Sequence, residues 1–542
     1  MLIVKTINSM EKVFPDTEPC ENEVQNVILS NQKFNLQLAI KNLSDYASKL
    51  NTITVGGELA EYVSLRTVEL VPASFLPVAS DDYYISRGIG LYPDLLCPID
   101  KKGVTIPAGQ WKSVYVTIYN PDGIKAGDHT LTFTVKNENG EEDANLSYDL
   151  KVLDLSLPKT DIALTNWMHY DCISNQHNTR LFDDDFYKIF SKYLKAYTEC
   201  GNNMLLVALF TPPLDTLVGG ERKTAQLVKV FKSGEHYTFS FEDLKRFIKF
   251  AQSHGIEFFE FSHLFTQWGG ASCPKIVVSQ NGEEKTIFGW DTQADSKEYK
   301  AFLNAFLPEL VKGVYELKIE DKCYFHLTDE PGKEHLERYA ACRNIVKAHL
   351  KDLPIIDAMS SYEFYEQGLV DIPAVLTPHY SDFTKNGLQD IFAYYCCVPS
   401  NDFYSNRFLN IPLQRLRILG FQLYLNKSKG FLHWGFNFYN TAFSLEGINP
   451  YFDTCAGGMF PAGDSFIVYP AKDDVLMTIR AEAMREAVQD YRLCKLVETQ
   501  LGEDEVIKLL ADFKLCGFNE YPHSITEHEK IRQKLVLLIN KM

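Results

Sequence analysis

The chain has 542 residues, which suggests two to four domains or one large barrel with an appended module. Its 54 Lys and Arg residues against 71 Asp and Glu residues give a net charge of −17, which argues against binding to nucleic acids or anionic membranes, because phosphate binding needs clustered positive charge. Apolar residues make up 45% and charged residues 23%, a balance typical of a soluble globular protein with a large core.

The sequence shows no membrane helix and no export signal. Its longest apolar run, Met204–Phe210, is far shorter than the roughly 20 residues that a membrane helix needs. The N-terminus has four apolar residues before Lys5 and no small-residue cleavage site. Twelve cysteines include no CxxC pair, and the adjacent Cys396 and Cys397 suit neither a zinc site nor a disulfide framework. These features predict a cytoplasmic protein with free thiols.

Residues 1–157 are expected to form an antiparallel β-sandwich. Apolar and polar residues alternate in the clearest stretches, and turn sequences such as Asn120-Pro121-Asp122-Gly123 separate them. No convincing amphipathic helix interrupts this pattern, which is typical of a sandwich of about 150 residues. The expected strands are Val24–Leu29, Phe34–Ile40, Ala60–Leu70, Ser113–Tyr119, His129–Val135 and Leu146–Leu153.

Residues 158–475 are expected to form a (β/α)8 barrel of the TIM type, because eight apolar strands alternate with helical stretches over about 280 residues. The rival is a doubly wound sheet, but no GxGxxG follows the first strand. The expected strands are Leu164–Tyr170, Asn203–Thr211, Ile256–Leu264, Cys323–Thr328, Pro354–Met359, Ala374–His379, Ile391–Cys397 and Gly430–Phe438. The expected helices are Asp183–Cys200, Phe241–His254, Lys297–Lys318, Lys333–His349 and Leu413–Asn426.

Other elements decorate or follow this barrel. Two hairpin-like insertions are expected around Val228–Phe241 and Ile276–Gly289. Residues 476–542 are expected to be a helical segment packed on the barrel. Its first helix spans Val475–Leu501, opened by Asp473-Asp474 and closed near Gly502, and two more lie around Glu505–Leu515 and Ile525–Ile539.

The sharpest chemical signal is FHLTDEP, residues 325–331, where an apolar strand runs into Asp329-Glu330 and then Pro331. Proline cannot extend the strand pairing, so both carboxylates are expected at the carboxyl end of the strand, where barrels build active sites. Two close carboxylates move each other's pKa values apart, which leaves one as an acid and one ionised. The alternative is that the pair caps the following helix.

Further candidates lie at other strand ends and could stack on or hydrogen-bond to a sugar. No HxH, no HExxH and no cysteine partner at ligand spacing accompanies the histidines, so no metal and no cofactor is expected. A GxSxG elbow and a P-loop are also missing from the sequence. The substrate-binding candidates are Trp167, His169, His263, His326, Tyr380, Tyr394, Trp434, Asn437 and Asp464.

Eight motifs, taken together and in order, resemble glycoside hydrolase family 123, and they are closest to a bacterial branch that carries the same barrel as a domain of unknown function. The resemblance covers residues 160–495, and the preceding sandwich is similar to the family's N-terminal domain. The motifs are FTPPLDT (210–216), FHLTDEP (325–331), YYCCVP (394–399), NRF (406–408), GFLHWGFNFY (430–439), DTCAGG (453–458), GDSFIVYP (463–470) and REAVQDYR (485–492).

The resemblance implies an exo-acting N-acetyl-β-galactosaminidase that retains anomeric configuration and uses the substrate's own acetamide as nucleophile. The family's catalytic pair matches Asp329, which would orient and stabilise the acetamide as it closes to an oxazolinium, and Glu330, which would protonate the leaving oxygen. Relatives from gut bacteria tend to carry signal peptides, so the missing signal favours hydrolysis of imported oligosaccharides. The expected partner is an oligosaccharide or glycoconjugate substrate.

Two alternatives remain open at this level. The chain could be a non-catalytic carbohydrate-binding barrel whose carboxylate pair has lost its role. It could also be a barrel glycosidase of different specificity, such as a β-N-acetylglucosaminidase or an enzyme for sugars without the acetamide. The choice between axial and equatorial O4 depends on one or two hydrogen-bond donors that the sequence does not locate, and the oligomeric state is equally undetermined.

Overall fold

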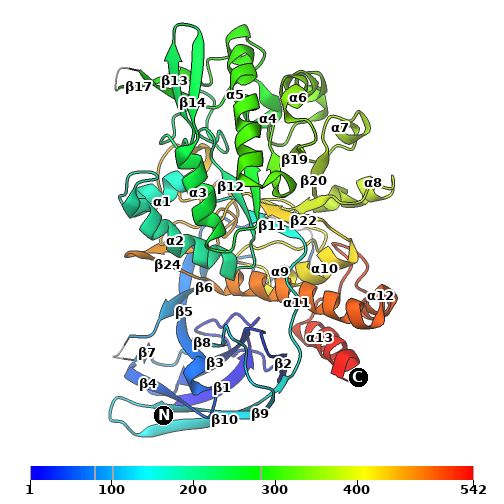
Figure 1. The fold of residues 1–542 in the computed structure, drawn as a ribbon. Coiled ribbons are helices and arrows are strands. Elements are labelled where there is room, and N and C mark those ends of the chain that lie inside the picture. The colour runs from blue at the N-terminus through cyan, green and yellow to red at the C-terminus, as the bar shows by residue number, and fades with distance from the viewer. Residues whose placement is uncertain (1, 23, 78–80, 101–102, 281–282, 541–542) are drawn as a thin grey trace.

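The computed structural model describes all residues except 1, 23, 78–80, 101–102, 281–282 and 541–542. A β-rich N-terminal part and an α/β part lie one above the other in Figure 1, with C-terminal helices beside their junction. Among the described residues, no helix is both long enough and apolar enough to cross a bilayer.

Two five-stranded sheets make up the N-terminal part, in the orders β1-β3-β8-β5-β6 and β2-β10-β9-β4-β7. Inward-facing side chains of both sheets, among them Leu38, Val116, Phe133 and Val152, form one apolar core, as a sandwich requires. Among the described residues of this part, all pairings are antiparallel except β2 with β10. The strands are β1 (Leu2–Asn8), β2 (Val27–Leu29), β3 (Phe34–Asn42), β4 (Ser48–Gly56), β5 (Val63–Ala73), β6 (Gly90–Pro98), β7 (Val104–Ile106), β8 (Trp111–Ile118), β9 (Gly127–Lys136) and β10 (Glu142–Leu153).

The second part is a nearly closed barrel of eight parallel strands, in the order β18-β15-β12-β11-β22-β21-β20-β19. An isolated parallel bridge between Phe325 and Ile355 links the two outer strands. The eight strands expected from the sequence are therefore confirmed, although each is shorter. They are β11 (Ala163–Asn166), β12 (Met204–Val207), β15 (Phe258–Phe261), β18 (Cys323–Phe325), β19 (Ile356–Met359), β20 (Ile372–Leu376), β21 (Phe392–Tyr394) and β22 (Gly430–His433).

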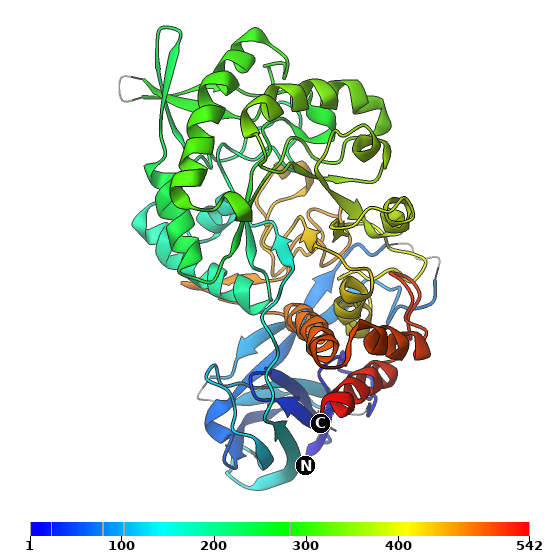
Figure 2. The same cartoon turned by 45° about the vertical axis from the view of Figure 1, so that its right-hand side comes forward.

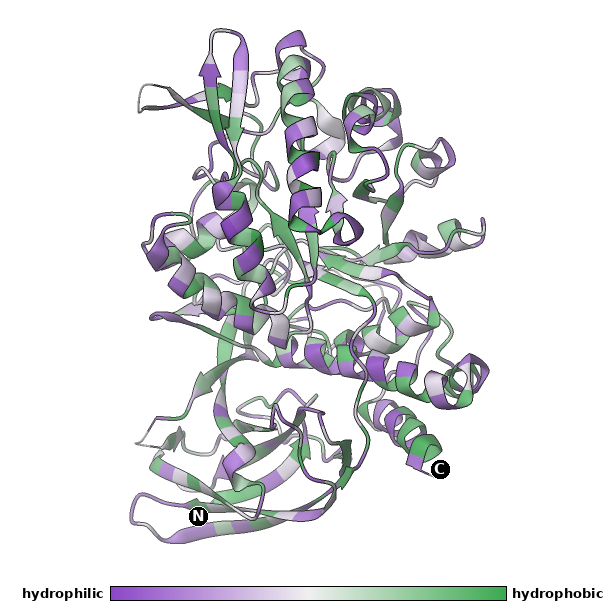
Figure 3. Ribbon diagram, viewed as in Figure 1, coloured by the Kyte–Doolittle hydropathy of each residue, from purple (hydrophilic) through white to green (hydrophobic). Residues whose placement is uncertain are grey.

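Helices cover the outside of the barrel, and their apolar faces turn toward the strands (Figures 2 and 3). In α2, for example, Phe186, Phe190 and Tyr197 are buried in the core shared with the barrel. The helices are α1 (Tyr170–Gln176), α2 (Asp184–Glu199), α3 (Glu242–Gln252), α4 (Gln267–Gly270), α5 (Lys297–Leu317), α6 (Leu336–Leu350), α7 (Glu363–Glu366), α8 (Tyr380–Thr384), α9 (Leu413–Arg417) and α10 (Leu419–Leu425).

Both expected hairpins are present and pair with each other in one four-stranded sheet, in the order β14-β13-β16-β17. This sheet projects beyond the barrel next to α5 (Figure 1). Its strands are β13 (Lys229–Ser233), β14 (His236–Ser240), β16 (Ile276–Gln280) and β17 (Glu283–Phe288).

The C-terminal helices are α11 (Ile479–Leu501), α12 (Glu503–Asp512) and α13 (Ile525–Asn540). The expected start of the first helix at Val475 is wrong. Strand β24 (Asp474–Leu476) pairs with β23 (Tyr469–Ala471), and Thr478 caps α11 by accepting a hydrogen bond from the Ala481 amide. The division at residues 157 and 475 into three domains stays a prediction.

Helix α11 ties the two parts of the molecule together. Its Arg480 forms a buried ion pair with Asp94 of β6, and Glu482 pairs with Arg66 of β5. Further along the helix, Asp490 binds Arg417 of α9 at 2.9 Å. Because a broken buried ion pair leaves an uncompensated charge, these contacts hold α11 against both the sandwich strands and α9.

Candidate active site

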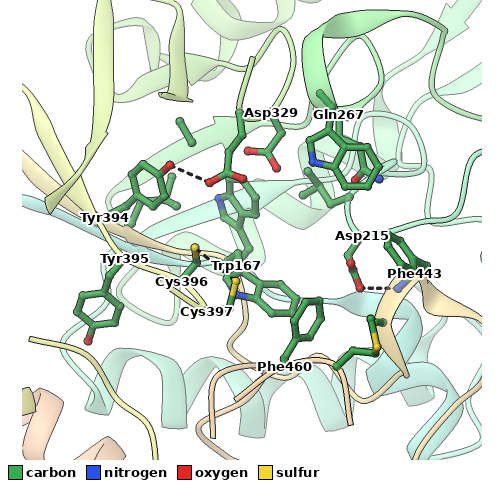
Figure 4. Close-up of a pocket in the computed structure, with 18 residues that line it drawn as sticks. Trp167, Asp215, Gln267, Asp329, Tyr394, Tyr395, Cys396, Cys397, Phe443 and Phe460 are labelled. Atoms are coloured by element: carbon green, nitrogen blue, oxygen red, sulfur yellow. Dashed lines mark hydrogen bonds between the residues drawn. The ribbon is translucent and has the colours of Figure 1, made fainter. Parts of the chain in front are cut away.

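A pocket of about 260 Å³ opens at the carboxyl ends of the barrel strands, beyond β18, β21 and β22 (Figure 4). This is the end at which barrel enzymes place their active sites. The pocket brings together five of the residues expected from the sequence. They are Trp167, Asp329, Glu330, Tyr394 and Trp434.

Asp329 and Glu330 both line this pocket, although strand β18 ends at Phe325, earlier than Pro331 alone would require. The early end follows from Asp357, whose carboxylate accepts hydrogen bonds from the Leu327 amide at 3.0 Å and from the Thr328 amide at 3.4 Å. Asp329 is half-buried and Glu330 exposed. Both carboxylates can therefore face one bound substrate.

The backbone of Glu330 adopts a φ of 42°, in the left-handed region that non-glycine residues rarely occupy. Such conformations gather at functional sites, where the surrounding structure holds them. The capping alternative is not what the structure shows: the N-cap positions of the following turn and helix are Gly332 and His335. Neither carboxylate occupies either position.

The loop at α4 closes over the pair. The Trp268 amide donates a hydrogen bond to the Asp329 carbonyl at 2.7 Å, while the Trp268 side chain lines the pocket and is 42% exposed. The next residue, Gly269, has a φ of 91°, and a Cβ there would lie 2.3 Å from the His335 ring. Only glycine allows this loop to approach the chain after Asp329 so closely.

The surroundings of Asp329 change its pKa. Burial and then the neighbouring Glu330 carboxylate raise the pKa of Asp329 well above its ordinary value, while His326 acts in the opposite direction. In the empty pocket Asp329 therefore tends to hold a proton. A positive charge developing beside it would favour the carboxylate again.

Tyr394 connects the pair to the opposite wall of the pocket. Its hydroxyl group donates a hydrogen bond to Glu330 Oε1 at 2.7 Å (Figure 4). Burial raises the pKa of Tyr394 well above its ordinary value, so the phenol remains a donor at neutral pH. The contact holds the Glu330 carboxylate in one orientation.

Beneath the pocket, a fully buried cluster of ionisable side chains joins three neighbouring strands of the barrel. His326 Nε2 lies 2.9 Å from Glu260 Oε2, and His326 Nδ1 lies 3.2 Å from Asp357 Oδ1. Burial alone would lower the pKa of His326, but the hydrogen bonds to Asp357 and Glu260 outweigh it and raise the pKa to about 9. Trp167 Nε1 also donates to Glu260, at 3.1 Å. His326 thus supports the pocket from below and does not line it.

His263 stacks on His326, with ring centroids 4.4 Å apart. Burial and then the His326 cation lower its pKa well below the ordinary value, so its ring is neutral. One ligand atom each from His263, His326 and Asp357 lies within 4.8 Å of the others. Both nitrogens of His326 are already bonded to carboxylates, so a metal there would have to displace one of these bonds.

Trp434 lines the pocket, and Asp464 holds it from behind. Trp434 Nε1 donates to Asp464 Oδ2 at 3.0 Å. Asp464 is fully buried, and burial raises its pKa to about 7 against the opposing effect of Arg407. Asp464 thus fixes the tryptophan ring without lining the pocket.

Three other expected contacts lie outside the pocket lining. His169 and Asn437 bond each other through the His169 amide, and burial followed by the Arg222 cation lowers the pKa of His169 to about 4. Tyr380 is the first residue of α8. Its hydroxyl group donates a hydrogen bond to the Asn426 carbonyl, and its ring packs against Phe518. The lining of this pocket, among the described residues, does not include His169, His263, His326, Tyr380, Asn437 or Asp464, and their role as substrate contacts stays a prediction.

Asp215, at the end of FTPPLDT, is a pocket residue that was not among the expected contacts. Its φ is 42°, and its carboxylate accepts a hydrogen bond from the Phe443 amide at 3.1 Å (Figure 4). Burial raises the pKa of Asp215 to about 6 although Arg222 opposes the shift. Its position after strand β12 was the available signal. Other pocket residues not expected are Leu214, Gln267, Trp268, Ala358, Tyr395, Cys396, Cys397, Leu432, Ala442, Phe443, Met459 and Phe460.

Comparison with known families gives one match, to the family model "Glycoside hydrolase 123, catalytic domain", over residues 167–497. The match contains Asp329 and Glu330 and all eight barrel strands except β11. No curated protein matches the chain.

Among solved structures, a family 123 glycoside hydrolase from Clostridium perfringens, described in a study of glycolipid glycan hydrolysis, is similar over 100% of this chain and 98% of its own, with a TM-score of 0.75 and 15% identity. A family 2 glycosyl hydrolase from Bacteroides cellulosilyticus covers 85% of this chain and 49% of its own, with a TM-score of 0.28 and 9% identity. A β-galactosidase from Bacillus circulans covers 64% and 57%, with a TM-score of 0.35 and 9% identity. The first likeness extends the shared fold to the N-terminal sheets.

Proposed function

Because the chain belongs to glycoside hydrolase family 123, we propose that it removes a terminal β-linked N-acetylhexosamine, N-acetylgalactosamine first among them, by a retaining, substrate-assisted mechanism. The observation that carries the proposal is the adjacent pair Asp329 and Glu330 on one pocket at the strand ends. An intramolecular acetamide takes the place of the enzyme nucleophile of an ordinary retaining glycosidase, so the protein needs one proton donor and one group that stabilises positive charge.

In this mechanism Glu330 protonates the departing oxygen, and Tyr394 keeps its carboxyl group aimed at that oxygen. Asp329 orients the acetamide N–H and stabilises the oxazolinium as the ring closes. The proton that Asp329 tends to hold passes to solvent as positive charge develops beside it, and Asp329 takes a proton from solvent again after the product leaves. Glu330 acts as base toward the water that opens the oxazolinium, and the proton it takes from that water restores its acid form.

Trp167 and Trp434 offer apolar ring surfaces to the sugar, and their indole N–H groups are already bonded to buried carboxylates. Beyond them, the side chains of Trp268 and Met459 line the pocket and are 42% and 61% exposed. An apolar aglycone would bury these side chains. The Clostridium perfringens relative is described with glycolipid glycans, and we propose a glycan carried on an apolar aglycone for this chain as well.

A panel of aryl β-glycosides tests the substrate-assisted mechanism. Turnover is expected with the 2-acetamido-β-galactoside and not with the plain β-galactoside, because only the first carries its own nucleophile. Rates should be measured by release of the aryl alcohol, with the 2-acetamido-β-glucoside included to compare the two configurations at O4.

Equal rates with and without the acetamido group would indicate a barrel glycosidase that works by another mechanism. Binding of the sugars without turnover of any of them would indicate a non-catalytic, carbohydrate-binding barrel. Activity is also expected to survive a chelator. Activity that is lost on chelation and restored by zinc would instead make the cluster of His263, His326 and Asp357 a metal site.

Asp215 is expected to bind a sugar hydroxyl as a carboxylate. Replacing it in Asp215→Asn should raise KM roughly 10- to 100-fold, the loss of one hydrogen bond to a charged group. Because the pKa of Asp215 is about 6, wild-type KM should fall as pH rises through that value, and the variant should lack this step. An identical pH profile of KM in both proteins would exclude the contact.

A further inference from the structure

Two adjacent thiols lie on the wall of the pocket. Cys396 and Cys397 follow β21, and their Sγ atoms are 4.0 Å apart (Figure 4). Both residues line the pocket that holds the carboxylate pair, and both are partly exposed. Neighbouring residues of a regular strand would point to opposite faces, so this arrangement depends on the end of the strand at Tyr394.

Hydrogen bonds hold the backbone of the turn that carries the two thiols. The side-chain amide of Asn406 donates to the Cys396 carbonyl at 3.0 Å and to the Pro399 carbonyl at 2.9 Å. Asn406 is 1% exposed, and the Cys396 amide donates to the Val398 carbonyl at 2.8 Å. The backbone beneath the two sulfurs is therefore fixed, and both remain directed toward the pocket.

The spacing suits two ligands of one soft centre. Two thiolates bound to a tetrahedral ion at about 2.3 Å each lie about 3.8 Å apart. The observed separation of 4.0 Å is close to this value. Thiolate ligands select soft centres over the hard ions that carboxylates prefer.

We propose that Cys396 and Cys397 form a two-thiol binding site for thiophilic metal ions and trivalent arsenicals, and that its occupation closes the pocket to substrate. With phenylarsine oxide, each sulfur forms one As–S bond, and the arsenic-bound oxygen leaves as water with both thiol protons. With Cd²⁺ the two thiol protons pass to solvent, and arsenic or cadmium keeps its oxidation state in each case. Binding itself is independent of the proposed function, whereas loss of turnover rests on it.

The test uses the full-length protein with phenylarsine oxide and, separately, with Cd²⁺. Intact mass under non-denaturing conditions should show one arsenical adduct on the wild type. Cys396→Ser and Cys397→Ser should each lose it, because one thiol cannot form both As–S bonds. Cys516→Ser, which removes an exposed thiol distant in sequence from the site, should keep it. A wild type without the adduct, or single variants that retain it, would overturn the site.

Turnover gives the second readout, with each variant compared with its own untreated rate. The wild type should lose activity with either probe and recover it with a dithiol but not with a monothiol, while both single variants should resist. N-acetylgalactosamine should also slow formation of the adduct, because the sugar and the arsenical share the pocket. An adduct that leaves turnover intact would overturn the closing of the pocket. A protein inactive on every glycoside that still forms the adduct would contradict the proposed function and not the site.

Discussion

Glu330→Gln is expected to lose most activity on glycosides with poor leaving groups and much less on activated aryl glycosides, whose departure needs little protonation. Asp329→Asn is expected to impair both classes, because ring closure of the acetamide precedes or accompanies every departure. Each loss should be on the order of 10²–10⁴ in rate, the scale of positioned proton transfer. Steady-state rates on paired substrates of both classes give the measurement.

Melting temperatures on the same preparations separate this result from a structural role. Both variants should remain folded, because neither carboxylate belongs to the apolar core. A helix-capping pair would instead cost about 0.5–2 kcal/mol of stability and leave turnover per folded molecule unchanged. If the dependence on leaving group appeared in Asp329→Asn, the proton that Asp329 tends to hold would be the catalytic one and the two roles would be reversed. Unchanged turnover in both variants would exclude the site.

The barrel could be predicted because its strands are buried on both faces and therefore appear as short continuous apolar runs. The same rule explains what was missed in the sandwich. Strands β1 and β6 form the two edges of one sheet, and β4 and β7 lie at one end of the other, so none of the four shows the continuous apolar run of a strand buried on both faces. Helix α1 was not expected either, because the sequence predicts one strand over Leu164–Tyr170, although β11 ends at Asn166 and α1 begins at Tyr170.

The catalytic pair could be placed because strand ends meet at one face of a barrel. How deep in the barrel each side chain lies could not be predicted in the same way. His326 and Asp329 follow the same strand, yet His326 points into the barrel interior and Asp329 into the pocket. The stagger of neighbouring strands decides which side chains reach the pocket, and the local sequence does not encode that stagger. Asp215 depends on the Phe443 amide, 228 residues away, and carries no local signal of that contact.

The buried charges beneath the pocket give the largest expected effect on stability. His326, Glu260 and Asp357 are each 0% exposed, and the pKa of His326 is raised from 6.5 to about 9. A group whose pKa is raised by folding stabilises the protein fully below its unfolded value, and this stabilisation is lost as pH rises through the folded value. For His326 that window runs from about pH 6.5 to 9.

His326→Gln keeps hydrogen-bonding groups but removes the charge, and it leaves two buried carboxylates facing a neutral amide. The expected loss is about 3 kcal/mol near pH 6, since one pKa unit corresponds to about 1.36 kcal/mol, and breaking buried ion pairs costs about 3–5 kcal/mol. Melting temperatures of wild type and variant should converge between pH 6.5 and 9, as the wild type gives up the same proton.

Asp185→Asn provides a matched control, because it breaks the exposed pair of Asp185 with Lys188, whose side chains are 72% and 73% exposed. That change should cost at most about 1 kcal/mol, the scale of surface ion pairs. If His326→Gln lowered the melting temperature by the same amount from pH 6 to pH 10, His326 would contribute its shape and not its charge beneath the pocket. Because the His326 cation lowers the proton affinity of Asp329, the variant should also shift the pH profile of turnover upward, an effect that lost packing alone would not produce.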